Sequence, residues 1–183
     1  MLLFYLSTVS TDSEKDKIIF IYENYYSYMA YKASKYLKSK QDIEDTVHNS
    51  MIKIIEHLDK IDINDPVKAK SFCGTVSKNK AIDFLRSKEN QNILSDEEEI
   101  NQFVDNTDPE EILITNETHN IILNAINSLN EKYRDVCILK YVNKLKEREI
   151  AEILGITPKN VNIRIFRGKQ LLRDALRKEG MHE

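Results

Sequence analysis

The chain has 183 residues, 31% of them charged and 41% hydrophobic, with only 4 glycines, 3 prolines and 2 cysteines. So few turn-forming residues exclude a turn-rich β-sandwich or barrel, and two cysteines exclude a dense disulfide framework. We therefore expect an all-α fold. Cys73 and Cys137 lie inside helical patterns and are interpreted as buried thiols, which fits a reducing cytoplasm.

Charge is distributed unevenly along the sequence. Residues 1–88 carry 14 basic and 12 acidic side chains, residues 89–117 carry ten acids and no base, and residues 118–178 carry 13 bases and six acids. A basic block behind an acidic strip indicates a polyanionic partner for the C-terminal part. A solvated basic face is the alternative, and composition alone does not separate the two.

The first predicted helix follows a short apolar arm. The arm, residues 2–6, has no basic residue before it and is too short to span a bilayer, so we interpret it as packing on the first domain and expect no membrane insertion. Thr11 and Glu14 have the spacing of a capping box, and apolar residues recur behind them at helical intervals. This pattern predicts a helix over about 13–38.

Two more helices complete the predicted first domain, residues 1–88. Asp42 is expected to cap a second helix whose apolar stripe runs from Ile43 to Leu58. The pair Asp65-Pro66 offers an N-cap followed by proline at the first helical position, which predicts a third helix ending near Lys88. Gly74, inside this third helix, costs about 1 kcal/mol relative to alanine.

The remainder divides into a linker, a second domain and a tail. Residues 89–108 are acidic and only weakly periodic, which predicts a flexible linker. A second Asp-Pro pair then opens a helical domain over 109–178, in which one helix is expected through Ile112–Leu129 and another through Tyr133–Tyr141. Residues 179–183 form a short tail.

Residues 147–161 have the spacing of a helix-turn-helix. Ile150 and Leu154 are expected to face a core, with Gly155 at a turn position that requires positive φ. Thr157 is expected to cap the second helix, and Pro158 to take its first position. An ordinary helical hairpin is the alternative.

The second helix of this motif has a face suited to duplex DNA. Basic side chains neutralise phosphates, asparagine amides pair with adenine, and an aliphatic side chain contacts a thymine methyl group. The candidate residues for DNA contact are Lys159, Asn160, Asn162, Ile163, Arg164, Arg167, Lys169 and Arg173.

A helix-turn-helix alone would suit any DNA-binding regulator, and two motifs in the first domain indicate a narrower class of protein. One is Asp42-Ile-Glu-Asp45 followed by a helix of large apolar residues, and the other is Asn79-x-x-x-Asp83-x-x-Arg86. Together with the C-terminal segment from Leu129 they resemble the extracytoplasmic-function subfamily of the sigma-70 factors, the promoter-recognition subunits of bacterial RNA polymerase. The resemblance covers about residues 15–178, with both domains in the family's order.

This resemblance implies roles and partners. The partners would be core RNA polymerase (β′ clamp and β flap), promoter DNA and an anti-sigma protein, and the helix-turn-helix residues above would read the −35 element. The loop around Ile61–Lys70 and the helix after it would hold the melted −10 strand through Lys78, Asn79, Lys80 and Arg86, while Asp83 would orient neighbouring basic groups. The start of the second helix would bind core polymerase through Asp42, Glu44, Asp45, Val47, His48 and Met51.

The sequence departs from the family pattern at two places. Many members have Trp-Leu where this chain has Phe72-Cys73, and the commoner Lys/Arg-Ser pair of the recognition helix is replaced by Asn162-Ile163. The second departure puts the usual −35 sequence in doubt.

Two other functions remain open from the residues. One is a stand-alone helix-turn-helix regulator that binds duplex DNA as a dimer, and the other is a helical adaptor that binds only proteins. We expect no catalytic residue, metal or cofactor. Glu44 and His48 share a helical face, but no second histidine lies near, and the sequence has no Gly-rich phosphate loop or nucleophile elbow.

Overall fold

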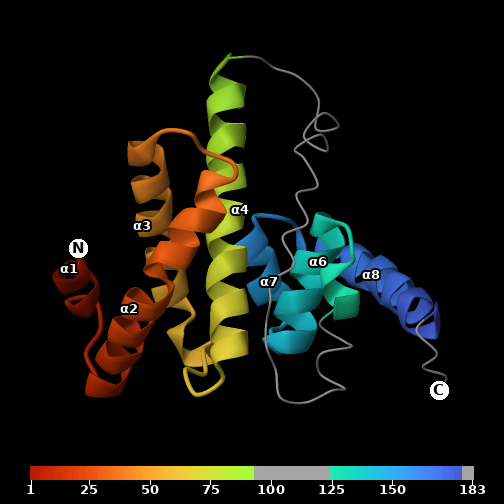
Figure 1. Ribbon diagram of the computed structural model, residues 1–183, viewed down its shortest axis with the longest axis horizontal. Coiled ribbons are helices and arrows are strands. Elements are labelled where there is room, and N and C mark those ends of the chain that lie inside the picture. The colour runs from red at the N-terminus through yellow and green to blue at the C-terminus, as the bar shows by residue number, and fades with distance from the viewer. Residues whose placement is uncertain (93–123, 179–183) are drawn as a thin grey trace. The chain divides into compact units, whose positions relative to one another are not determined.

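The computed structural model describes residues 1–92 and 124–178 (Figure 1). The chain forms two compact units, Met1–Ser95 and Asp96–Glu183. Within the described residues all regular structure is helical and no strand occurs. The predicted all-α class is therefore confirmed.

The first unit is a bundle of three long helices with a short helix at its side. It contains α1 (Leu2–Leu6), α2 (Asp12–Ser34), α3 (Lys40–Glu56), the short 3₁₀ helix η1 (Leu58–Lys60) and α4 (Pro66–Asn92). The helices α2, α3 and α4 pack against one another in every pairing, and α1 contacts α2 and α3. Their shared core includes Ile18, Ile21, Met29, Val47, Met51, Ile54, Phe72 and Val76.

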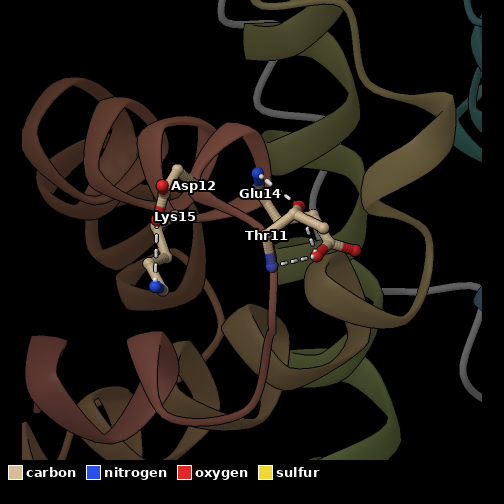
Figure 2. A network of polar contacts seen from close by, with 4 residues as sticks. All are labelled: Thr11, Asp12, Glu14 and Lys15. Atoms are coloured by element: carbon tan, nitrogen blue, oxygen red, sulfur yellow. Dashed lines mark hydrogen bonds and ion pairs between the residues drawn. The ribbon is translucent and has the colours of Figure 1, made fainter.

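The start of α2 is held by the predicted capping box, which Figure 2 shows. The backbone N–H of Glu14 donates to the Thr11 hydroxyl at 3.2 Å, and the Glu14 carboxylate accepts from the Thr11 N–H at 3.1 Å. Lys15 forms an ion pair with Asp12 at 3.1 Å on the same turn. The helix ends at Ser34, earlier than the expected boundary near residue 38.

The prediction that Asp42 caps α3 is wrong. Ser39 is the N-cap, and its hydroxyl accepts from the Asp42 N–H at 3.4 Å. Serine caps a helix about as well as aspartate, so the helix begins three residues earlier than Asp42 would place it. Asp42 then lies in the first turn, where a negative charge interacts favourably with the helix dipole.

The helix α4 is longer than predicted. Asp65 caps it as expected, since its carboxylate accepts from the Lys68 N–H at 3.1 Å. The helix continues to Asn92, so residues 89–92 are helical and do not belong to a flexible linker. No glycine or proline interrupts this stretch, and polar residues are tolerated at a helix end. The rest of the predicted linker, 93–108, lies outside the described residues.

The N-terminal arm packs on the first unit, as predicted. Tyr5 is fully buried, and its hydroxyl hydrogen-bonds to Nδ1 of His48 on α3 at 2.8 Å. The ring of Phe4 lies 5.6 Å from the His48 ring, measured between centroids. A helix of five residues is not stable alone, so these contacts hold α1 in place.

The second unit contains a helical stretch at residues 124–127, then α6 (Glu131–Cys137), η3 (Ile138–Val142), α7 (Glu147–Leu154) and α8 (Pro158–Lys178). The start of the helix predicted over 112–129 lies outside the described residues. The element η3 is a π-helix, in which the Asn143 N–H donates to the Ile138 carbonyl at 3.0 Å. The helix α8 packs against α6 and α7 around a core of Ile126, Leu129, Cys137 and Ile138.

Both cysteines are buried free thiols, as predicted. Burial raises the pKa of the Cys73 thiol far above its ordinary value, and it raises the pKa of Cys137 to about 11. Cys137 lies where α8 crosses α6. A Cβ atom added to Gly168 would lie 2.7 Å from the Cys137 sulfur, so a larger residue at 168 would force this sulfur or the helix to shift.

Candidate nucleic-acid interface

The turn between α7 and α8 has the geometry of a helix-turn-helix. Gly155 has φ 62° and ψ 30°, the left-handed conformation that glycine adopts without strain. The Thr157 hydroxyl accepts from the Asn160 N–H at 3.2 Å and so caps α8. Ile150, Leu154 and Val161 are buried and fix how the two helices pack. The sequence prediction for this motif is confirmed.

Most predicted −35 residues lie on the exposed side of α8. Val161 is buried and marks the inward side of the helix. Because successive residues are rotated by about 100°, residues two or five positions from Val161 face outward. The exposed members of the predicted set are Lys159, Asn160, Asn162, Ile163, Arg167, Lys169 and Arg173. The structure therefore places basic, amide and aliphatic side chains on one accessible helix surface.

The two arginines that seemed equivalent in the sequence differ in the structure. Arg167 is exposed, and a hydrogen bond from it lowers the pKa of the Tyr133 hydroxyl on α6. Arg164, in contrast, is half-buried at the flank of the helix and has its own interactions. Of this pair, Arg167 is better placed to reach a phosphate.

Sequence reasoning missed Phe166. This side chain is 64% exposed on α8, more than Ile163 at 41%. Helical spacing already puts Phe166 outside the inward stripe predicted from Val161, Ile165 and Leu172, so the signal was present in the sequence.

Acidic side chains gather at the start of α3, where the resemblance expects a polymerase contact. Asp42 forms an ion pair with Lys88 of α4 at 2.9 Å, and Glu44 lies 3.7 Å from Lys40. Asp45 is exposed. His48 is half-buried under α1 through its bond to Tyr5.

Two residues predicted to contact polymerase lie in the core instead. Val47 and Met51 are both 0% exposed. They follow the inward side of α3, four residues apart, so they pack the helix and cannot offer side chains to a partner without unfolding. The exposed apolar residue of α3 is Ile52, which shares the outward side with Asp45 and which the sequence reading did not select.

The residues predicted to bind the −10 strand also differ in how exposed they are. Lys78 is only 8% exposed and has its own interactions, so little of it is accessible to a DNA strand. The aliphatic stem of lysine can be buried along apolar surface, which sequence spacing does not reveal. Asn79 donates from Nδ2 to the Thr75 carbonyl at 2.8 Å. Lys80 and Arg86 are partly accessible.

Asp83 lies beside the basic residues of α4. Its carboxylate is 3.8 Å from Arg86. Burial raises the pKa of the Asp83 carboxyl, and Lys80 and Arg86 oppose that shift. The spacing Asn79, Asp83 and Arg86 puts all three on one side of the helix. The carboxylate is thus within ion-pair distance of Arg86.

An aromatic ring with two cations lies between α2 and α4. The Lys70 and Lys32 ammonium groups are 4.9 Å and 5.4 Å from the Tyr28 ring centre. A Cβ atom at Gly74 would lie 2.7 Å from Tyr28 Cε1. Glycine at residue 74 therefore leaves room for the Tyr28 ring, which explains its presence in the helix despite its low helix propensity.

Neither a metal cluster nor a membrane span is found in the parts of the chain that the structure describes. Among those residues no three His, Cys, Asp or Glu side chains are grouped to hold a metal ion. No described helix is both long and apolar enough to cross a bilayer.

Comparison with known families matches both halves of the chain. Residues 21–91 match the family model of sigma-70 region 2, and residues 119–172 match that of sigma-70 region 4. The chain is 31% identical over 168 residues to the ECF RNA polymerase sigma factor SigW of Bacillus subtilis (strain 168). The alignment covers 87% of each protein. It is 28% identical over 149 residues to the RNA polymerase sigma factor SigV of the same organism, covering 81% of this chain and 84% of that protein.

One solved structure aligns with most of the chain. It is the sigma factor RpoE in complex with the anti-sigma factor NepR from Bartonella quintana, 17% identical, with a TM-score of 0.39. The alignment covers 85% of this chain and 94% of that one.

Proposed function

The chain belongs to the extracytoplasmic-function subfamily of the sigma-70 factors, which direct RNA polymerase to promoters, and we propose that it does so through three separate surfaces. One surface on α8 reads the −35 duplex, one on α4 holds the −10 strand, and one on α3 binds core polymerase. Catalysis of RNA synthesis belongs to the polymerase.

The exposed face of α8 is the observation that carries this proposal. Lys159, Arg167 and Arg173 are exposed, and Asn160 and Asn162 lie near the start of the helix. In a helix-turn-helix the residues near the start of the second helix reach base edges in the major groove, while basic side chains contact phosphates. The capped and glycine-terminated turn fixes this helix on its unit, so the side chains are preorganised for a duplex.

Charge reversal at Arg167 tests the −35 surface. In a holoenzyme reconstituted from the full chain and core polymerase, Arg167→Glu is expected to weaken promoter binding about tenfold or more, since it removes a charge-assisted contact. If about five phosphates are contacted, the wild-type slope of log affinity against log salt is about −4.5, and the variant slope is about one unit shallower. Equilibrium binding of fluorescent promoter DNA at several salt concentrations measures both.

The matched control is Lys38→Glu, the same charge change at an exposed residue between α2 and α3. It should leave promoter binding near the wild-type value. Unchanged binding by Arg167→Glu would favour the protein-only adaptor, and tight binding of palindromic DNA by the isolated chain would favour the stand-alone regulator.

The acidic start of α3 is the proposed polymerase surface. Asp42, Glu44 and Asp45 lie in the first turns of α3, and the outward side of Asp45 and His48 continues to the apolar Ile52. Exposed charges steer association, whereas a buried apolar contact at the centre of an interface contributes more of the affinity. Val47 and Met51 support this surface from inside the core.

The −10 surface is proposed on the accessible part of α4. Lys80 and Arg86 carry positive charge toward solvent, and Asp83 orients Arg86. Asn79 lies on the same side of the helix as Asp83 and Arg86. Positive side chains follow the backbone of single-stranded DNA. Lys78 takes part only through packing.

An anti-sigma protein that masks these surfaces, and a cytoplasmic location beside the polymerase, belong to the same proposal. Both rest on membership of the family.

A further inference from the structure

Two exposed apolar side chains lie in the middle of the basic helix α8. Ile163 is 41% and Phe166 64% exposed. They are three residues apart, so they lie about 60° from one another on the helix surface. Val161, which is fully buried, lies about 200° from Ile163 and about 140° from Phe166. Ile163 and Phe166 therefore form a ridge on the side of α8 that points away from the core.

The surroundings of this ridge are strongly positive. Residues 158–177 contain six basic side chains and one acid, Asp174. Lys159, Arg167 and Arg173 are exposed and flank the ridge on the same helix. An apolar centre between positive margins matches a ligand that is apolar in the middle and negative at its edges.

The major groove of a thymine-containing duplex has this chemistry. Its edges are lines of phosphates, and each thymine places a C5-methyl group on the groove floor that apolar side chains contact. A protein partner would have to meet the same face with an acidic rim.

We propose that Ile163 and Phe166 together are specificity determinants that select thymines in the −35 element through their methyl groups. This rests on the proposed function of α8 and adds what that surface selects. Asn160, Asn162 and Arg167 then supply polar contacts around the apolar pair. A recognition helix with two apolar readers selects a sequence different from one with a Lys/Arg-Ser pair at 162–163.

Uracil substitution tests this directly, because uracil differs from thymine only by the methyl group. The −35 sequence is first obtained by selecting genomic promoter fragments that the wild-type holoenzyme binds. Each thymine of that element is then replaced singly by uracil, and holoenzyme binding is measured. At a contacted position the wild type should lose about fourfold in affinity, and about fifteenfold when two contacted methyls are removed.

The double variant Ile163→Ser, Phe166→Ser should bind thymine and uracil duplexes equally. Leu171→Ser is the matched control: Leu171 is also 41% exposed on α8, but it lies about 80° from the buried Val161, on the flank of the helix. It should keep the wild-type loss on uracil substitution.

The outcomes separate the two claims. If the wild-type holoenzyme selects no −35 sequence, the proposed function of α8 fails. If it selects one, but no uracil position weakens binding or the double variant keeps the same sensitivity, the methyl-reading ridge is wrong while −35 recognition stands.

Discussion

Gly168 on α8 lies directly against Cys137 of α6 in the second unit. A Cβ atom at Gly168 would lie 2.7 Å from the Cys137 sulfur and 3.7 Å from Tyr133 Cβ. Cys137 is fully buried in the core, so its short side chain has little room to move. The absence of a side chain at residue 168 thus sets how closely α8 approaches α6.

Gly168→Ala is expected to destabilise the second unit. Overpacking costs about 1–3 kcal/mol, which equals or exceeds the gain of about 1 kcal/mol in helix propensity. In the Cys137→Ala background the same substitution should be neutral or stabilising, because the clash is gone. Chemical denaturation of the wild type, the two single variants and the double variant measures the free energy of unfolding. An equal loss of stability in both backgrounds would show that the sulfur contact does not limit the packing.

The two thiols are expected to be unreactive in the folded chain. The thiolate is the reactive form, and burial raises the pKa of both Cys73 and Cys137. Reaction with Ellman's reagent at pH 8 should therefore be slow until denaturant is added, when both thiols react. Rapid modification of either one with helicity unchanged would contradict the burial described above.

Sequence spacing predicted the burial of apolar residues well and that of polar residues poorly. Helical periodicity identified the buried residues Ile150, Leu154 and Val161 correctly. It did not show that Lys78 is buried, because residue type favours a surface position. Val47 and Met51 were assigned to a partner by resemblance although their own periodicity fits a core.

At the scale of elements, α1 is held by one polar contact and a few ring contacts. The Tyr5 hydroxyl lies 2.8 Å from Nδ1 of His48, and burial raises the pKa of Tyr5 to about 12. Tyr5 also contacts the rings of Phe4 and Tyr22. The arm is thus attached to the helix that carries the proposed polymerase surface.

Tyr5→Phe is expected to loosen α1 selectively. Loss of one hydrogen bond costs about 1 kcal/mol, and the aromatic packing remains. Amide hydrogen exchange should become faster at residues 2–6 and stay unchanged in α2 and α4. Unchanged exchange at residues 2–6 would mean that ring packing alone holds the arm.

Helix starts were predicted better than helix ends. Thr11, Asp65 and Thr157 cap their helices as the sequence indicated, because a cap is a local side-chain contact. The choice between Ser39 and Asp42 could not be made from type alone, since both cap well. The end of α4 at Asn92 carries no glycine or proline signal, so its position depends on packing and solvation that spacing does not encode.

At the scale of the whole molecule, the proposed surfaces for polymerase and for the −35 element lie on different units. The acidic start of α3 and the basic face of α8 belong to different compact units. Loss of either surface should therefore produce a different defect: one in assembly with polymerase, the other in promoter recognition by the assembled enzyme.

Transcription by core polymerase at increasing concentrations of the full chain tests this division most directly. Asp45→Lys should need more chain to reach wild-type transcript levels, because only assembly is weakened, whereas Arg167→Glu should stay defective at saturating chain. Glu23→Lys, the same charge change at an exposed residue of α2, should behave as wild type. Full activity in both variants, or rescue of both by added chain, would contradict the separate surfaces.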